Sequence, residues 1–412
     1  MKFLLNILQQ QEHLFQKGGK LEKLYPLYEA QRTFLFTPPQ TTVKGPHIRD
    51  SVDMKRVMIT VVFALLPLII FSFYNTGLQT ARAYNEVQNL AWWQLMVNGL
   101  LIELPIIITS YVVGGLWETI FAIVRKHPIS EGFLVTGILL PLTLPPTVPL
   151  WQVAMGVSFG VVIGKEIFGG VGMNILNPAL TARVFLFFAY PASMSGDAVW
   201  IKLIDGNHWI DSFLYHTAGA GLVEGFSGAT ALATAFTVPA NMEPMGIMQD
   251  MSNFNHFNWF TLFIGLVPGS IGETSAMLAL VGALILIVSG VGSWRIIVAT
   301  IAGALVMGFG MNLWSNGTGY MALPPWYHLV MGGFMFGAVY MATDPVSATA
   351  TDAGKWIYGF LIGVLCVLIR VWNPAYPEGM MLAILFMNIF APLIDHFVVQ
   401  RNIQRRLARA KK

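Results

Sequence analysis

Long apolar segments recur along this chain, and they constrain its fold more than any other feature. Hydrophobic residues make up 55% of the sequence and charged residues only 11%, less than half the charged share of soluble domains. A helix needs roughly 20 mainly apolar residues to cross a bilayer. The sequence therefore predicts an all-α integral membrane protein with about ten transmembrane helices. The expected spans are 57–73, 95–113, 133–144, 150–164, 175–190, 276–291, 296–314, 328–341, 356–371 and 380–399.

Basic residues predict the orientation of these helices, because cytoplasmic loops are enriched in Lys and Arg. The tail 401–412 holds six basic residues and no acid, and Lys55 and Arg56 precede the first span. Both termini are therefore expected on the cytoplasmic side. Arg125 agrees with this scheme if the second span continues down to it, whereas Arg370 lies on the wrong side as a single exception.

The same pattern divides the chain into regions. The first is expected to be a cytoplasmic arm, either partly an amphipathic surface helix or a loosely ordered tail. This arm comprises residues 1–53. Residues 54–190 and 259–400 would each hold five helices, 191–258 would lie on the outer, periplasmic face, and 401–412 form a basic cytoplasmic tail. A further apolar stretch, 259–267, is too short to span and is expected at the interface or as a re-entrant segment.

Two halves with an odd number of helices each have opposite topology, so the fold is predicted as two inverted five-helix repeats. Each half contains an Asn-Pro or Asp-Pro pair followed by small residues, Asn177-Pro178 and Asp344-Pro345. Proline ends or kinks a helix. Broken helices near the middle of the membrane are how many transport proteins build a central site.

Acidic residues lie within or next to the apolar spans. A carboxylate in the middle of the bilayer costs ~3 kcal/mol on insertion scales, so such residues mark ion paths or pair with a base. Asp344 favours a cation site, because a carboxylate and freed backbone carbonyls are what a hard cation such as Na⁺ accepts. Glu118 and Asp395 lie near helix ends, where a carboxylate that reaches water is an equally good interpretation. The set comprises Glu103, Glu118, Glu166, Glu273, Asp344 and Asp395.

Three further polar residues lie near the fifth expected span. Arg183 requires an anion or carbonyl groups nearby, either a cofactor or an acid in a structural ion pair. Asn174 and Asn177 follow the glycine-rich stretch 169–172. Their amides could bind a planar heterocycle with imide edges. From the residues alone, helix capping by Asn is the favoured interpretation.

Other classes of function are excluded by composition. The single cysteine, Cys366, excludes an internal disulfide and a cysteine-ligated iron–sulfur cluster within the chain. The net charge of +3 gives no indication of nucleic-acid binding. No metal site is expected beyond transient binding of Na⁺.

The outer region contains the string Ser227-Gly228-Ala229-Thr230, which on its own would be read as a turn before a helix. It resembles the flavin attachment motif of a membrane redox family, in which the phosphate of FMN is esterified to the Thr hydroxyl. Small residues before the Thr leave room for the flavin and for the transferase that installs it.

With this motif, the chain resembles the NqrB subunits of the bacterial Na⁺-translocating NADH:quinone reductases over essentially its whole length. The matching segments are 47–53, 125–127, 165–166, 174–178, 185–191, 227–230, 268–273, 342–348 and 373–379. One departure is Glu224, since an Asp commonly stands six residues before the flavinylated Thr. The segment 201–221 and a short loop expected after Tyr74 also differ in length from relatives.

The resemblance implies a redox-driven sodium pump of the bacterial inner membrane, with five partner subunits and a repeat-built fold like that of ammonium and urea transporters. FMN would be covalent on Thr230, beside Ser227 and Gly228, and electrons would pass through noncovalent riboflavin to ubiquinone. The implied site residues are Asn174 and Asn177 for riboflavin, Arg183 for a cofactor, Gly114 and Gly115 for quinone, and Glu118, Asp344 and Asp395 for sodium.

Two alternatives remain at this point. The RnfD subunit of an Rnf-type electron-transport complex shares the fold and a flavinylated Thr. A channel or transporter for small polar solutes without a redox role would also contain intramembrane acids and inverted repeats.

Overall fold

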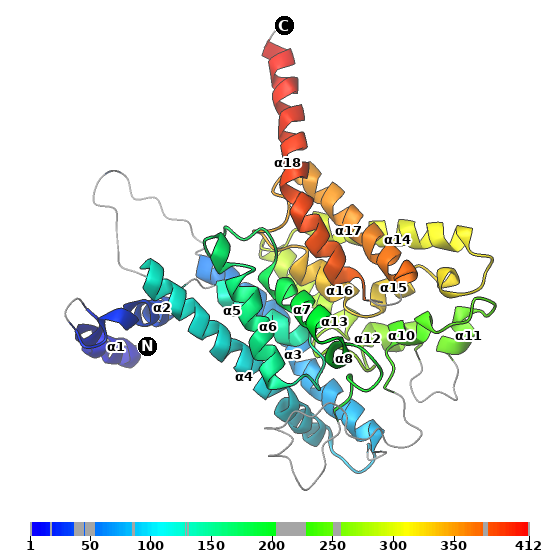
Figure 1. Cartoon of the computed structure of the whole chain (residues 1–412), viewed down its shortest axis with the longest axis horizontal. Helices are drawn as coiled ribbons and strands as arrows, with labels where there is room; N and C mark the ends of the chain where they lie inside the picture. The colour runs from blue at the N-terminus through cyan, green and yellow to red at the C-terminus, as the bar shows by residue number, and fades with distance from the viewer. Residues whose placement is uncertain are drawn as a thin grey trace.

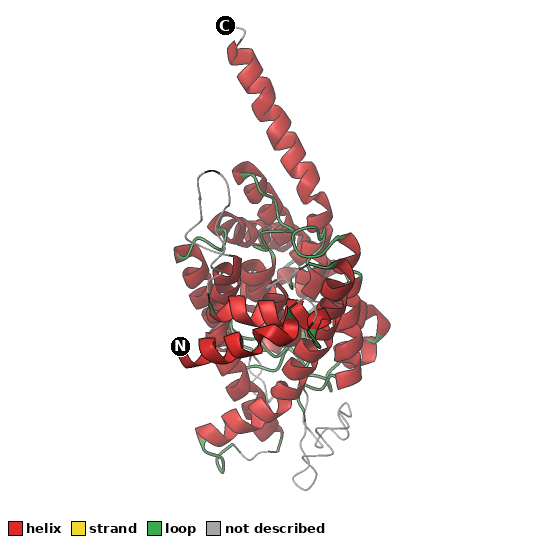
Figure 2. Ribbon diagram, turned by 90° about the vertical axis from the view of Figure 1, so that its left-hand side faces the viewer, coloured by secondary structure: helices red, strands yellow, loops and turns green. Residues whose placement is uncertain are grey.

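The computed structural model describes residues 2–16, 19–36, 45, 54–84, 87–127, 129, 132–202, 228–249, 257–373 and 378–410. In this part of the chain the structure is helical and contains no strand (Figure 2). Six of its helices are long and apolar enough to cross a membrane, and three shorter apolar helices accompany them. The prediction of an all-α, multi-pass membrane protein is therefore confirmed.

The observed helices coincide with the expected spans. α6 (Leu150–Val162) continues through a turn into the short η2 (Glu166–Phe168). The other long helices are α3 (Met54–Ala83), α4 (Trp92–Arg125), α14 (Trp294–Trp314), α17 (Asp352–Trp372) and α18 (Met380–Ala410). The shorter apolar helices are α5 (Gly132–Thr143), α7 (Pro178–Ala189) and α13 (Ala276–Val288).

The expected span 328–341 is broken into three pieces. It is observed as α15 (Tyr327–Val330), α16 (Phe334–Phe336) and the π-helix η4 (Gly337–Met341). Arg370 explains how the break is tolerated, since it is fully buried and its guanidinium donates to the carbonyls of His328 (2.5 Å), Met331 (2.9 Å) and Glu378 (2.9 Å). Arg370 is therefore a buried structural residue rather than a loop charge, which accounts for its exception to the orientation pattern.

α3 is longer than predicted. The prediction of a short loop after Tyr74 is wrong, because the helix continues to Ala83. Two of the polar residues in this segment donate hydrogen bonds to distant backbone carbonyls. Asn75 donates to the carbonyl of Val267 (3.0 Å), and Thr80 donates to that of Lys202 (2.9 Å). A buried polar side chain costs little free energy when it is hydrogen-bonded. The helix can therefore continue through these polar residues.

α3 and α4 cross closely. A Cβ on Gly99 would lie 1.8 Å from the carbonyl oxygen of Phe73, so the helix backbones touch at this point. One turn further, the fully buried Glu103 accepts hydrogen bonds from Ser72 (2.7 Å) and Thr76 (2.6 Å). Glu103 therefore joins the two helices. α4 also continues to Arg125, as the orientation scheme requires.

The ends of the chain are helical. α1 (Lys2–Phe15) and α2 (Tyr25–Leu35), joined through η1 (Glu22–Leu24), lie on the outside of the molecule (Figure 1). α2 and η1 contact α4, and α1 packs on α2 and η1. A helix in the N-terminal arm is thus confirmed, while the motif at 47–53 lies outside the described residues. α18 projects far beyond the body as a continuous exposed helix through 401–410 (Figure 1).

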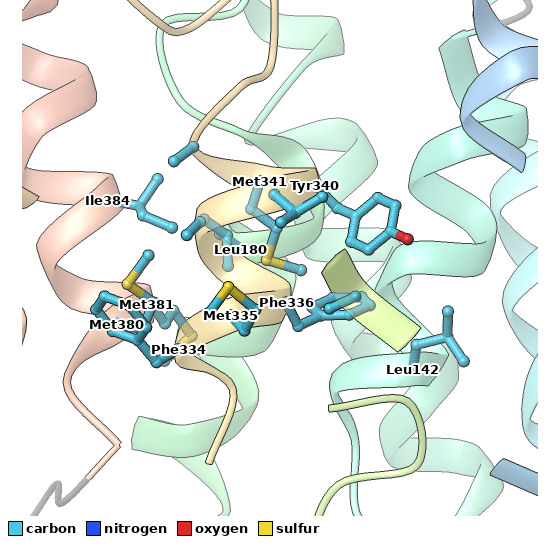
Figure 3. Close-up of a cluster of buried hydrophobic side chains, with 14 of the residues drawn as sticks. Leu142, Leu180, Phe334, Met335, Phe336, Tyr340, Met341, Met380, Met381 and Ile384 are labelled. Atoms are coloured by element: carbon cyan, nitrogen blue, oxygen red, sulfur yellow. The ribbon is translucent and has the colours of Figure 1, made fainter. Parts of the chain in front are cut away.

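The two halves of the chain share one core. Figure 3 shows side chains of α5 and α7 meeting those of α16, η4 and α18. Leu142 lies on α5, Leu180 on α7 and Phe336 on α16, and all three are buried. The backbone of the second half also reaches the first, because the N–H of Gly272 donates to the carbonyl of Leu142 (2.7 Å). Short helices α8 (Pro191–Met194), α10 (Ala231–Phe236), α11 (Pro244–Met248), α12 (Trp259–Ile264) and η3 (Tyr320–Ala322) complete the fold.

Candidate functional site

A first cavity, called here the Thr230 cavity, is lined by Thr230, Trp200, Ser270, Glu273 and Glu378 among others. Thr230 is the N-cap of α10, where its hydroxyl oxygen accepts a hydrogen bond from the N–H of Ala233 (3.3 Å). The Thr230 hydroxyl is therefore held at the wall of the cavity by the start of a helix.

The residues before Thr230 are only partly described. Gly228 is buried, and a Cβ on it would lie 2.4 Å from the carbonyl oxygen of Asp197, so a larger residue would force the backbone apart. Ser227 and Glu224 lie outside the described residues.

An ion network forms part of the same cavity. Arg183 of α7 is buried, and its guanidinium contacts Glu273 (3.4 Å) and Glu378 (2.5 Å), both of which line the cavity. Two acids therefore share one cation here. Because Glu273 and Glu378 both lie far from Arg183 in the sequence, hydropathy alone could not have identified this arrangement.

A second cavity, called here the central cavity, lies between the two halves and brings together the two Pro-containing breaks. Asn174 and Asn177 line it from the first half, and Asp344 lines it from the second. Its apolar wall includes Val61 of α3, and Lys165 supplies a basic group. Residues about 170 positions apart in the sequence thus line the same cavity, because a broken segment from each half ends at this point.

Each of the two asparagine side chains uses one end of its amide in a hydrogen bond and, among the described residues, leaves the other end without one. The Asn177 side-chain oxygen caps α7 by accepting from the N–H groups of Ala179 (3.0 Å) and Leu180 (3.3 Å). Asn174 donates from its amide nitrogen to the carbonyl of Leu176 (2.9 Å). Within the described part of the chain, the Asn174 oxygen and the Asn177 nitrogen have no further partner. The Asn174 oxygen as an acceptor and the Asn177 amide group as a donor therefore remain for a ligand with both kinds of group.

Asp344 is turned back on its own segment. Its carboxylate accepts from the Ser347 hydroxyl (2.6 Å) and from the N–H of Val346 (3.4 Å). This local turn keeps a carboxylate at the cavity wall next to a helix end, where backbone carbonyls lack helical partners.

A chain of charges leads from the central cavity to Glu118. Lys165 and Glu118 form a close ion pair, and each is only 3% exposed. Lys165 also contacts Glu166 (3.4 Å), which in turn contacts Arg125 (3.2 Å). The sequence marks Glu118 as part of an ion path but does not identify Lys165 as its partner, because the pairing joins α4 to the turn after α6.

Gly114 and Gly115 face different surroundings. A Cβ on Gly114 would lie 2.1 Å from the ring of Phe133, whereas a Cβ on Gly115 would meet nothing within 4 Å. The Lys165 ammonium lies over the Phe133 ring, 5.9 Å from its centroid. Gly114 is thus connected to the charge chain through one aromatic ring, and Gly115 is not.

Gly114→Ala is therefore expected to lower stability by about 1–3 kcal/mol, the usual cost of overpacking a core. Gly115→Ala is expected to be neutral or slightly stabilising, since Ala favours the helix over Gly. Thermal unfolding of the purified complex in detergent compares the two variants. Equal effects of both substitutions would contradict the difference in packing.

Asp395 lies apart from both cavities. From α18 it accepts hydrogen bonds from the N–H groups of Ala350 (2.7 Å) and Thr351 (3.0 Å) and from the Thr351 hydroxyl (2.5 Å). These contacts hold the N-terminus of α17 against α18. The geometry thus gives Asp395 a structural contact in addition to any part in ion passage.

Comparison with known proteins decides between the candidate families. Residues 41–404 match the model of the NQR2, RnfD, RnfE family. The chain is 49% identical to the NqrB subunit of the Na⁺-translocating NADH-quinone reductase of Stutzerimonas stutzeri (strain A1501), over 97% of each chain. The corresponding protein of Ectopseudomonas mendocina (strain ymp) is 48% identical over 97% of both chains, and that of Klebsiella pneumoniae (strain 342) is 47% identical, over 98% of this chain and 99% of the relative. This chain belongs to the NqrB family of the Na⁺-translocating NADH-quinone reductases.

Membership of the NqrB family rules out the two alternatives raised from the sequence. The family model also includes Rnf-type proteins, but the similarity to NqrB extends over nearly the whole length. A non-redox channel is likewise excluded as a description of this chain.

Proposed function

We propose that this protein passes electrons from FMN esterified to Thr230, through riboflavin, to ubiquinone, and couples this transfer to Na⁺ export across the bacterial inner membrane. The proposal is supported most strongly by one observation. Asn174, Asn177 and Asp344 line a single cavity between the two halves, and Lys165 on its wall contacts Glu118.

The Thr230 cavity fits a covalently held flavin. The Thr230 hydroxyl lies at the cavity wall, and Gly228 allows the close backbone approach just before it. The side chains of Ser270 and Trp200 on the same wall offer a hydroxyl and an aromatic face, the groups that contact polar edges and flat rings. Arg183 and its two acids would form the floor beneath this flavin.

The central cavity fits riboflavin. A flavin imide edge alternates acceptors with one donor, and the cavity offers the unengaged Asn177 nitrogen and Asn174 oxygen. When bound, the flavins supply reversible electron transfer. The residues of this chain would hold the ring, exclude water from it and place Lys165 and Asp344 beside it.

The remaining assignments follow from the same arrangement. Gly114 and Gly115 would lie in the quinone region near the cytoplasmic side, with part of the N-terminal arm. Glu118, Asp344 and Asp395 would contact Na⁺ during uptake and passage. Negative charge that appears in the central cavity would favour a cation at these acids, because opposite charges attract strongly where the dielectric constant is low.

We propose the inverted repeat for the fold, as in ammonium and urea transporters. In the first half α4 packs on α6 and α6 on α7, and in the second half α14 packs on α17 and α17 on α18. The tripeptide Asn-Pro-Ala occurs in both halves, at the start of α7 (177–179) and shortly before α18 (373–375). Both termini would then lie in the cytoplasm, 191–258 on the periplasmic face, and the five partner subunits around this chain.

The sodium dependence of quinone reduction tests this function. Glu118→Ala and Asp344→Ala are each expected to raise the Na⁺ concentration for half-maximal rate at least about tenfold, equivalent to ~1.4 kcal/mol, with normal flavin content. Asp352→Ala is the control, because the Asp352 side chain is 70% exposed at the start of α17. Unchanged sodium dependence in both test variants would refute the proposed ion path.

A further inference from the structure

Lys165 is a buried cation at the junction of the proposed flavin and sodium sites. Among the described residues that line the central cavity, Lys165 is the one base and Asp344 the one acid. The Lys165 side chain is 3% exposed. An ammonium removed from water is strongly destabilised unless it is paired, so its partners determine where it can lie.

The acids that contact Lys165 are not themselves part of the central cavity lining. Glu118 contacts it most closely, and Glu166 lies 3.4 Å away. Arg125 contacts Glu166 at 3.2 Å. The cluster thus contains two acids and two bases and is neutral as a whole. Because the cluster has no net charge, it does not attract Na⁺. In this arrangement the Glu118 carboxylate is already paired with the Lys165 ammonium.

We propose that the Lys165 ammonium is shared between Glu118 and the flavin of the central cavity, so that it favours flavin reduction and releases Glu118 to Na⁺. The inference rests on the proposed function, since it takes a flavin in this cavity. Negative charge in the cavity attracts the ammonium away from Glu118. The carboxylate left behind is buried and uncompensated, which favours a cation such as Na⁺ at that position. Lys165 is therefore a positioning residue: it acts on the sodium ion through Glu118, which it releases.

The first test measures the reduction potential of the noncovalent flavin in the purified complex by spectroelectrochemistry. Lys165→Met is expected to lower the equilibrium constant for one-electron reduction at least about tenfold, which is a shift of ~59 mV to lower potential. Lys165→Arg keeps the charge and is expected to restore most of the potential. Lys202→Met is the matched control, because Lys202 is also buried, at 5% exposure, but does not line the central cavity.

The second test uses a double variant, because Lys165→Met alone leaves Glu118 uncompensated and can unfold the chain. Lys165→Met/Glu118→Gln removes both charges of the pair and is expected to fold. It should keep the lowered flavin potential but lose the dependence of that potential on Na⁺. In folded Lys165→Met, the Na⁺ concentration for half-maximal quinone reduction should fall, since Glu118 no longer has an internal cation.

A folded double variant with an unchanged flavin potential would overturn the proposal and leave Lys165 as a structural counter-ion. Failure of the underlying function looks different. The unaltered complex would then contain no noncovalent flavin on extraction, and both the proposed function and this inference would be overturned before any variant is made.

Discussion

Thr230→Ala is expected to abolish covalent flavin on this protein. The hydroxyl that would form the phosphoester is absent from alanine. A denatured gel band of the unaltered protein should fluoresce under ultraviolet light, and the band of the variant should not. Because Thr230 also caps α10, the same substitution costs about 0.5–2 kcal/mol of local stability.

Two further variants separate attachment from capping. Thr230→Asn supplies a good capping group but no hydroxyl, so its band should also be dark while the helix is retained. Thr234→Ala removes a hydroxyl one turn further along α10, where it does not line the cavity, and its band should remain bright. A fluorescent Thr230→Asn band would place the flavin on another residue.

Arg370→Met is expected to have the largest effect on stability. The guanidinium is fully buried and donates to three carbonyls, those of His328, Met331 and Glu378. Hydrogen bonds to a charged group contribute about 1.5–3 kcal/mol each, and methionine satisfies none of them. We expect a loss on the order of 3 kcal/mol or more, with collapse of the broken segment 327–341. Melting temperature and the yield of assembled complex measure the effect.

Arg295→Met is the matched control for Arg370→Met. Arg295 contacts Asp352 at 3.0 Å, but the two side chains are 33% and 70% exposed. Exposed ion pairs contribute about 0–1 kcal/mol, so this variant should melt close to the unaltered protein. Comparable losses of stability for both variants would show that the effect of Arg370→Met does not come from its hydrogen bonds to the three carbonyls.

The long apolar segments were sufficient to predict where most of the helices lie. α5, α13 and α17 occur where the expected spans 133–144, 276–291 and 356–371 place them. The extension of α3 past Phe73 could not be predicted, because Asn75, Thr80 and Arg82 read as the start of a loop. Their partners are carbonyls of Val267, Lys202 and Leu266, which hydropathy cannot associate with them.

The candidate site was predictable residue by residue but not as an arrangement. The motif around Thr230 and the pairs Asn177-Pro178 and Asp344-Pro345 were visible in the sequence. That Asn177 and Asp344 line one cavity follows from the packing of two halves about 170 residues apart. Lys165 stood out only as part of a matching segment, since its pairing with Glu118 depends on how α4 and α6 cross.

Mass spectrometry of the peptide that contains Thr230 determines whether this residue holds the flavin. The measurement uses the native complex, purified from its own membranes and digested without reduction of the flavin. We predict that the peptide is heavier by the mass of FMN less one water, with fragmentation placing the addition on Thr230. An unmodified peptide, or an addition on Ser227, would refute attachment of the flavin at Thr230.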